Sequence, residues 1–354
     1  MSGSAAPLVS VVIPAYKAEE FIEEAIGSIR QQEHRPIEVV VVEDCSPDGT
    51  AAIVERLAAE WSGQEFVIRL LRQPENRGGA AALARGFAEA RGAYLCWLSA
   101  DDAFVGTTKL GEQIEQLSKR RGVSYATSYY RGPSAARLTQ DDLVTAMWDP
   151  ARAYMEWIMR LFPRARLIGL LFRNPINGST VMIDRATWER SGSFDAILGN
   201  IDQDSDVWMR YSALGVRVSN ISSASGFYRI HSGQTSNLQE DCVIGAAARR
   251  IRLVMAYEQT GRLPQLLRRT WPILALVHRW EWYVERPLAA DYLCEAGLRV
   301  SRCMFVRRFL KKIQAAVATR GIADPRLAEA ARAQAAETYE SREFQAFIRR
   351  LSGR

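Results

Sequence analysis

The stretch that decides the fold is "IEVVVVED", residues 37–44. Four consecutive valines form the centre of a short apolar run that ends at Asp44. A continuous run of β-branched residues is typical of a strand buried on both faces, and such strands occur mostly in parallel sheets covered by helices. The stretch therefore predicts a central strand of an α/β protein.

The flanking sequence repeats this pattern. Three further short apolar runs predict strands at 9–14, 66–71 and 93–99. Apolar residues recur at helical spacing between the runs, at 18–32, 51–61 and 79–90. Strands that alternate with helices predict a mostly parallel sheet with helices on both faces, and such sheets bind ligands beyond the carboxyl ends of their strands.

Polar residues gather where three of these predicted strands end. We expect them to share one rim of the sheet, at Pro14 to Tyr16, Glu43 to Asp44 and Ser99 to Asp102. The adjacent carboxylates of Asp101 and Asp102 repel each other unless a positive group is near. Hard cations such as Mg²⁺ and Mn²⁺ accept one or two such carboxylates together with substrate phosphates. A solvated turn or a helix cap is the alternative interpretation of the pair.

Composition limits the class of protein. The 354 residues include 46 basic and 40 acidic side chains, so the net charge is +6. No nucleic-acid-binding motif is recognised, and we expect no nucleic-acid partner. The five cysteines are odd in number and lack CxxC spacing, which argues against a disulfide framework or a zinc site. No apolar run approaches the roughly 18 residues of a membrane span, and we expect a cytoplasmic protein.

Five segments, in order, resemble family 2 of the nucleotide-sugar glycosyltransferases. They are "VSVVIPAYKAEEFIEEAIGSI" (9–29), "EVVVVEDCSPDGT" (38–50), "NRGGAAALARGFAEARGAYLCWLSADD" (76–102), "DQDSDVWMRYSALG" (202–215) and "YRIHSGQTS" (228–236). The resemblance implies the GT-A fold, in which a Rossmann-like, mostly parallel central sheet is flanked by helices. A dinucleotide oxidoreductase is disfavoured, because no G-x-G-x-x-G follows the first predicted strand.

The resemblance also implies roles for the rim. Pro14, Ala15 and Tyr16 would line the nucleotide pocket, and Asp44 would accept a hydrogen bond from the nucleotide base. These four residues would thus bind the donor rather than act in the chemical step.

The family's DxD-type element corresponds to Ser99, Ala100, Asp101 and Asp102. By resemblance, this element would contact the ribose and the diphosphate-bound Mn²⁺ or Mg²⁺. Asp101 and Asp102 would hold the metal, and which of them is the direct ligand stays open. His231 would lie near the diphosphate or complete the metal shell.

The segment 202–210 offers three aspartates as catalytic candidates. The resemblance implies that Asp204 is the general base, six residues before Arg210. Asp206 and Arg210 are four residues apart, so they could form an ion pair on one helix face. Asp202 is the third candidate and is not matched to the family's base.

The sequence departs from the family pattern at three places. Ser99 stands where the family often has Asp, which leaves the metal to the two following acids. Residues 83–84 replace an Arg-Asn pair, so a polar donor contact is lost or moves to Arg77 or Arg85. Gln203 stands where the family often has Glu, which would change how the base is oriented or how its pKa is set.

The implied activity is that of a metal-assisted, inverting hexosyltransferase in polysaccharide or glycoconjugate biosynthesis. The expected donor is a uridine diphosphate sugar. A glycan, a lipid-linked molecule, a small molecule or a peptide could be the acceptor. The alternative is a non-catalytic, glycosyltransferase-like protein that binds a nucleotide sugar or a glycan.

We expect two regions. Residues 1–237 would form the catalytic domain, with a nucleotide-sugar half at about 7–106 and an acceptor half at about 107–237. Residues 238–354 have helical patterns almost throughout and would form a helical extension. Within that extension, arginines lie beside aromatic and apolar residues at 268–286 and 302–313. Such segments favour either a peripheral contact with an anionic membrane or packing, against the catalytic domain or against a second subunit in a homodimer.

Overall fold

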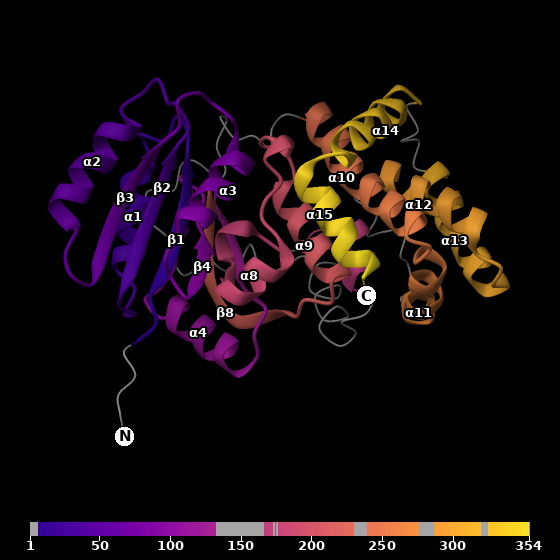
Figure 1. The fold of residues 1–354 in the computed structure, drawn as a ribbon, viewed down its shortest axis with the longest axis horizontal. Coiled ribbons are helices and arrows are strands. Elements are labelled where there is room, and N and C mark those ends of the chain that lie inside the picture. The colour runs from indigo at the N-terminus through magenta and orange to yellow at the C-terminus, as the bar shows by residue number, and fades with distance from the viewer. Residues whose placement is uncertain are drawn as a thin grey trace. The chain divides into compact units, whose positions relative to one another are not determined.

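The structure is a computed structural model that describes residues 6–131, 166–172, 174, 176–229, 239–275, 287–319 and 325–353. The described residues form two compact units, one built on a sheet and one built of helices. Both are drawn in Figure 1.

The sheet of the first unit has eight strands in the order β3-β2-β1-β4-β7-β6-β8-β5. The strands are β1 Val9–Ala15, β2 Ile37–Glu43, β3 Phe66–Arg72, β4 Tyr94–Trp97, β5 Ala103–Phe104, β6 Val123–Arg131, β7 Met182–Asp184 and β8 Val218–Arg229. The helices of this unit are α1 Ile22–Arg30, α2 Thr50–Trp61, α3 Gly79–Glu89, α4 Lys109–Lys119 and α8 Arg185–Ser191, with short 3-10 turns η2 Gly178–Thr180 and η3 Ala196–Leu198.

The predicted mostly parallel sheet is confirmed. Strands β3, β2, β1 and β4 are parallel neighbours, and β6 pairs in parallel with β8. Antiparallel pairing is confined to β7, which lies between β4 and β6, and to the two-residue strand β5.

Helices cover both faces of the parallel strands, which explains the continuous apolar runs. On one face Val11 and Val39 are fully buried in a core that also contains residues of α1, α2 and α4. On the other face Val12 and Val42 are buried beneath α3. Gly86 allows α3 to approach closely, because a Cβ atom there would lie 2.3 Å from the Val12 Cγ1 atom.

The second unit is helical, so the predicted helical C-terminal region is confirmed. Its helices are α7 Arg166–Phe172, α9 Gln203–Ala213, α10 Gln239–Gln259, α11 Leu263–Ala275, α12 Pro287–Val300, α13 Met304–Thr319, α14 Pro325–Tyr339 and α15 Arg342–Ser352. Small buried residues such as Ala247, Ala289 and Ala331 let α10, α12 and α14 pack closely. Within the described ranges, no helix is both long and apolar enough to cross a bilayer.

The two units interleave along the chain, because α7 and α9 belong to the helical unit although they precede residue 237. The sequence-based division into two domains at residue 237 therefore stays a prediction.

A pair of helical glycines tests the packing of α3. Gly86→Ala should lower the free energy of unfolding by about 1–3 kcal/mol, because overpacking forces well-packed neighbours apart. Gly111→Ala in α4 is the matched control, since a Cβ there meets nothing within 4 Å. That change should be neutral or stabilising by up to about 1 kcal/mol. Urea unfolding measures both, and equal effects of the two changes would contradict the close approach of α3.

Candidate active site

The structure brings the predicted rim residues to one edge of the sheet. Strands β1 and β2 pair in parallel with Ala15 opposite Glu43, and the Asp44 amide donates to the Ala15 carbonyl at 2.9 Å. Strand β4 pairs in parallel on the other side of β1, with Trp97 opposite Val12. The carboxyl ends of all three strands therefore lie at the same edge, where α/β sheets bind their ligands.

Asp44 is buried, and its carboxylate fixes the turn that begins α3. The Oδ1 atom accepts hydrogen bonds from Gln73 Nε2 at 2.6 Å and from the Arg77 amide at 2.8 Å. The Oδ2 atom accepts from the Gly78 amide at 2.7 Å. Gly78 has φ +81°, a conformation that favours glycine. Each carboxylate oxygen can accept two hydrogen bonds, so Oδ2 retains capacity for a ligand N–H.

The carboxyl end of β1 and the residue that follows it differ in exposure. Ala15 is buried and Pro14 half-buried, whereas Tyr16 is 45% exposed. The Lys17 ammonium lies 5.4 Å from the centroid of the Tyr16 ring. Tyr16 therefore has the exposure that a pocket-lining residue needs, and its contact with a nucleotide stays a prediction.

The two arginines expected to replace a donor contact differ in their surroundings. Arg85 donates from Nη1 to the Arg72 carbonyl at 2.7 Å, so its guanidinium holds the end of β3. Leu83, which replaces a polar family residue, is fully buried. The side chain of Arg77 is exposed. Of the two arginines, Arg77 is therefore the better candidate for a contact with the donor.

Ser179 organises the DxD-type element. Its hydroxyl donates to Asp102 Oδ2 at 2.5 Å, and its oxygen accepts from the Ser99 amide at 3.1 Å. Asp102 Oδ1 accepts from the Arg229 amide at 3.1 Å. Burial and the neighbouring Asp101 carboxylate raise the pKa of Asp102 well above its usual range. Asp102 is thus enclosed and internally bonded, whereas Asp101 is partly exposed.

This arrangement fits a divalent cation that shares its coordination shell with substrate. Asp101 offers a partly exposed carboxylate, while Asp102 is only 2% exposed and Ala100 is buried. Across the described ranges, no three His, Cys, Asp or Glu side chains group closely enough to hold a metal ion by themselves. Phosphate or water oxygens would have to supply most ligands, as Mg²⁺ commonly requires. The third predicted ligand, His231, lies outside the described residues.

Asp204 lies in the first turn of α9, in the helical unit. Its Oδ1 atom accepts from the Ser205 amide at 2.7 Å, and its Oδ2 atom accepts from Asn174 Nδ2 at 3.0 Å. The side chain keeps partial access to solvent. The surrounding protein and the Asp202 carboxylate raise the pKa of Asp204 to about 7, although the Ser205 amide, Arg250 and Asn174 oppose this shift.

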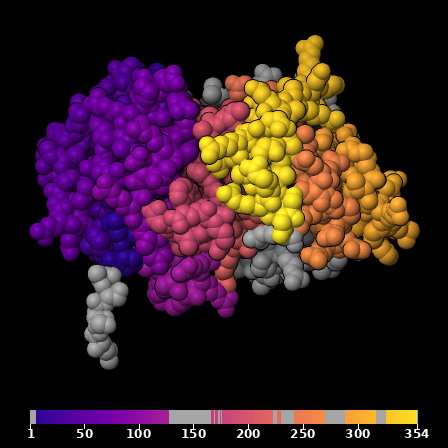
Figure 2. Space-filling view, in the orientation of Figure 1, coloured from indigo at the N-terminus to yellow at the C-terminus, as the bar shows by residue number. Residues whose placement is uncertain are grey.

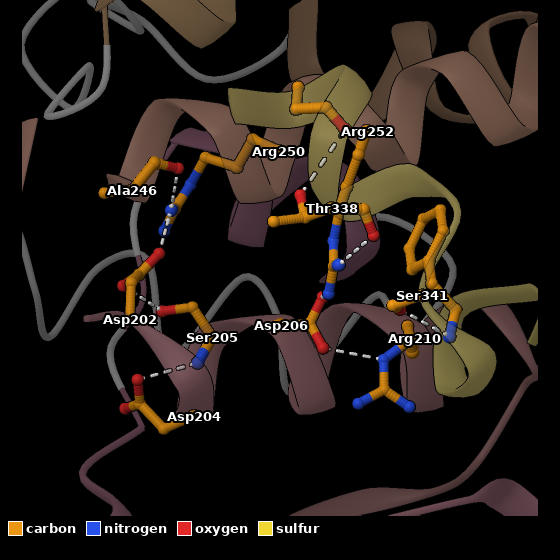
Figure 3. Close-up of polar contacts among 12 residues, drawn as sticks. Asp202, Asp204, Ser205, Asp206, Arg210, Ala246, Arg250, Arg252, Thr338 and Ser341 are labelled. Atoms are coloured by element: carbon orange, nitrogen blue, oxygen red, sulfur yellow. Dashed lines mark hydrogen bonds and ion pairs between the residues drawn. The ribbon is translucent and has the colours of Figure 1, made fainter. Parts of the chain in front are cut away.

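Asp202 occupies the N-cap position of the same helix, in a left-handed backbone conformation with φ +54°. Its Oδ1 atom accepts from the Ser205 hydroxyl at 2.6 Å, and its Oδ2 atom accepts from Arg250 Nη1. The same Arg250 nitrogen donates to the Ala246 carbonyl at 2.7 Å. Figure 3 shows this ion pair reaching from α10 to the start of α9, next to Asp204.

Asp206 forms the predicted ion pair with Arg210 and a second one with Arg252. The Arg210 Nε atom donates at 2.7 Å and the Arg252 Nη2 atom at 2.5 Å. Arg252 also donates from Nη1 to the Thr338 carbonyl of α14 at 3.0 Å. Burial alone would raise the pKa of Asp206, but the two guanidinium groups outweigh it and lower the pKa to about 2. Asp206 is therefore a structural carboxylate.

Sequence reasoning missed four residues that hold the candidate site, namely Ser179, Asn174, Arg250 and Arg252. The two arginines had a detectable signal, because "AAARRIRLV" at 246–254 places three arginines among residues that are otherwise all apolar. Charged residues on such a helix are rarely buried unless they are paired. The serine and the asparagine carried no comparable signal.

Known proteins and a protein-family model are similar to this sequence. Residues 10–189 match the model of glycosyl transferase family 2. TuaG of Bacillus subtilis (strain 168), whose name assigns it provisionally to teichuronic acid biosynthesis, is 27% identical over 231 residues, covering 65% of this chain and 82% of TuaG. The Escherichia coli protein WfaP, named as a UDP-Glc:alpha-D-GlcNAc-diphosphoundecaprenol beta-1,3-glucosyltransferase, is 25% identical over 229 residues, covering 65% of this chain and 80% of WfaP.

The solved structures support the fold independently. The mannosyltransferase PcManGT of Pyrobaculum calidifontis, solved with GDP-Man and Mn²⁺, superposes with a TM-score of 0.53 at 19% identity, covering 99% of this chain and 87% of that one. The match to the family model spans half of the chain and includes β1, β2, β4 and the DxD-type element. This chain therefore belongs to glycosyl transferase family 2.

Proposed function

We propose that this chain transfers a sugar from a nucleoside diphosphate sugar to an acceptor hydroxyl with inversion, and that Asp204 is the general base. The environment of Asp204 is the main support for this proposal. The side chain is partly exposed, both of its oxygens accept hydrogen bonds, and its pKa is about 7. A base with a pKa near the operating pH is both deprotonated and strong enough to accept a proton.

The reaction is a single displacement. The acceptor oxygen attacks the anomeric carbon while Asp204 takes its proton, and the bond from that carbon to the diphosphate oxygen breaks. Attack opposite the leaving group inverts the configuration. One base is sufficient for this route, whereas retention through a covalent intermediate needs a nucleophile beside the anomeric carbon.

Residues of the sheet unit would bind the donor. Asp44 would use the remaining capacity of Oδ2 for a base N–H, and Tyr16 and Arg77 would supply exposed contacts. Asp101 would hold Mn²⁺ or Mg²⁺, and a bound cation of this kind neutralises the charge that develops on a departing diphosphate. The mannosyltransferase was solved with both GDP-Man and Mn²⁺, which supports proposing a divalent metal here.

The names of the relatives favour a class of substrates. WfaP is named for a UDP-Glc donor and a diphosphoundecaprenol-linked GlcNAc acceptor, and TuaG for teichuronic acid biosynthesis. We therefore propose a uridine diphosphate sugar as donor and a lipid-linked glycan as acceptor. A thermal-shift panel of nucleotide sugars, with and without Mn²⁺, would identify the donor, because a ligand that binds only the folded state raises the melting temperature.

The first prediction concerns the base. Asp204→Asn should lower kcat by about 10²–10⁴-fold, because the amide cannot accept the acceptor proton. The melting temperature should hardly change, since the new side chain has the same shape and Asn174 can reverse its amide to donate or accept. Release of nucleoside diphosphate in the presence of acceptor measures kcat. Near-normal turnover of the variant would rule out Asp204 as the base.

The second prediction concerns pH. Asp204 must be ionised to act, so kcat should fall as the pH drops below about 7. Asp202→Asn removes a negative charge that raises the pKa of Asp204, so the acid limb of the profile should move to lower pH. Asp241→Asn, a change at an exposed carboxylate of α10, is the control and should leave the limb in place. A limb that stays fixed in Asp202→Asn would show that another group controls it.

The third prediction concerns the metal. Asp101→Asn should weaken the Mn²⁺-dependent thermal stabilisation by a nucleoside diphosphate at least tenfold in apparent affinity, because an amide is a poorer ligand for a hard cation. The melting temperature without ligand should stay close to that of the unmodified protein. Stabilisation that is equally strong in EDTA would argue against a metal at Asp101.

A further inference from the structure

Helix α13 has two different faces. Val306, Leu310 and Ile313 are buried, and Leu310 lies against Gly297 of α12. The opposite side of the helix is exposed, and its large or charged exposed residues are Met304, Phe305, Arg308, Lys311 and Lys312. At 100° per residue these five positions cover one continuous face. We call them, together with the preceding exposed Arg302, the α13 face.

The α13 face is strongly basic. Residues 302–319 contain five cationic side chains and no carboxylate. One of the five, Arg307, is turned inward, because its Nη1 atom donates to the carbonyls of Leu298 and Ser301. The other four are exposed, and none of them forms an ion pair with any residue that the structure describes. Their charge is therefore presented to solvent.

The same face exposes large apolar side chains. Met304 is 72% exposed and Phe305 is 58% exposed, more than any other large hydrophobic residue in the described ranges. They are adjacent in the first turn, Arg302 precedes the helix, and Arg308 and Lys311 are on the same helix face. Figure 2 shows atoms of this part of the chain, in orange, at the molecular surface.

We propose that the α13 face binds the surface of an anionic membrane. Lysine and arginine side chains are attracted to anionic lipid headgroups, while methionine and phenylalanine enter the boundary between headgroups and acyl chains. A second copy of this chain is a poorer partner, because two α13 faces would bring like charges together. A nucleic-acid backbone would satisfy the cations but would leave the Met304 and Phe305 side chains exposed.

The test measures vesicle binding by the whole chain without any donor, so it is independent of the proposed transferase activity. We expect the protein to float with vesicles of equal parts phosphatidylglycerol and phosphatidylcholine, and not with phosphatidylcholine alone. Raised salt should weaken the binding, since it screens the attraction between exposed charges.

Two double variants separate the charged from the apolar contribution. Lys311→Gln with Lys312→Gln should reduce partitioning roughly tenfold or more, because each cation near an anionic bilayer contributes substantially. Met304→Ser with Phe305→Ser should reduce it by a similar factor, since two large apolar side chains lose their burial. All four residues are exposed, so melting temperatures should be unchanged.

Matched control variants remove the same kinds of side chain from surfaces outside the α13 face. Arg120→Gln with Arg121→Gln removes two exposed charges from the end of α4, and Val67→Ser with Ile197→Ser removes two exposed apolar side chains. Both controls should bind like the unmodified protein. Equal losses in the controls and in the α13 variants, or no flotation with anionic vesicles, would overturn the proposal.

Two further results would show that the α13 face binds a partner other than a membrane. A DNA oligonucleotide that binds as tightly as the vesicles, with no effect of the Met304 and Phe305 changes, would identify a general polyanion site. A dimeric mass that becomes monomeric when Met304 and Phe305 are changed would identify an interface between copies. Either result would overturn the proposal while leaving the proposed transferase activity untouched.

Discussion

The helical unit depends on one buried carboxylate, Asp206, between two guanidinium groups. Arg210 is on the same helix and Arg252 is on α10, and both side chains are fully buried. Removing Asp206 would leave the two buried guanidinium groups without this carboxylate, and breaking a buried ion pair in this way costs about 3–5 kcal/mol. Arg252 also bonds the Thr338 carbonyl, so the ion pairs fix α9 against α10 and α14. These ion pairs, together with the Arg250–Asp202 pair, hold the first turn of α9 in place.

Asp202, Asp204 and Asp206 consequently differ in their charged partners, and Asp204 and Asp206 also differ in their pKa values. Asp206 is paired with two cations, which keeps it ionised. Asp202 accepts from Arg250 and from the Ser205 hydroxyl. Among the described residues, the donors to Asp204 are the neutral Ser205 amide and Asn174, so desolvation and the Asp202 charge raise its pKa. Carboxylates whose surroundings push their pKa values apart commonly divide structural and proton-transfer roles between them. The environment thus favours Asp204 as the base over its two neighbours.

The fold was predictable because continuous valine runs and helical spacing are local signals. Those signals predicted the parallel strands and the shared rim of Asp44 and Asp101. The partners of the site residues were not predictable in this way. Ser179 reaches Asp102 across 77 positions, and Arg250 reaches Asp202 across 48, so only the folded chain brings them together. Helix propensity also does not determine which face of α13 is buried, because this depends on the helices that pack against it.

The account is tested most directly by the titration of Asp204 itself. Carboxyl-carbon NMR of the ligand-free protein can follow each aspartate with pH, and the spectrum of Asp204→Asn assigns the signal. We predict a midpoint near pH 7 for Asp204 and continued ionisation of Asp206 down to about pH 2. An Asp204 signal that titrates near the ordinary aspartate value of about 4 would contradict the account, because the surroundings of α9 would then not prepare this carboxylate to act as a base.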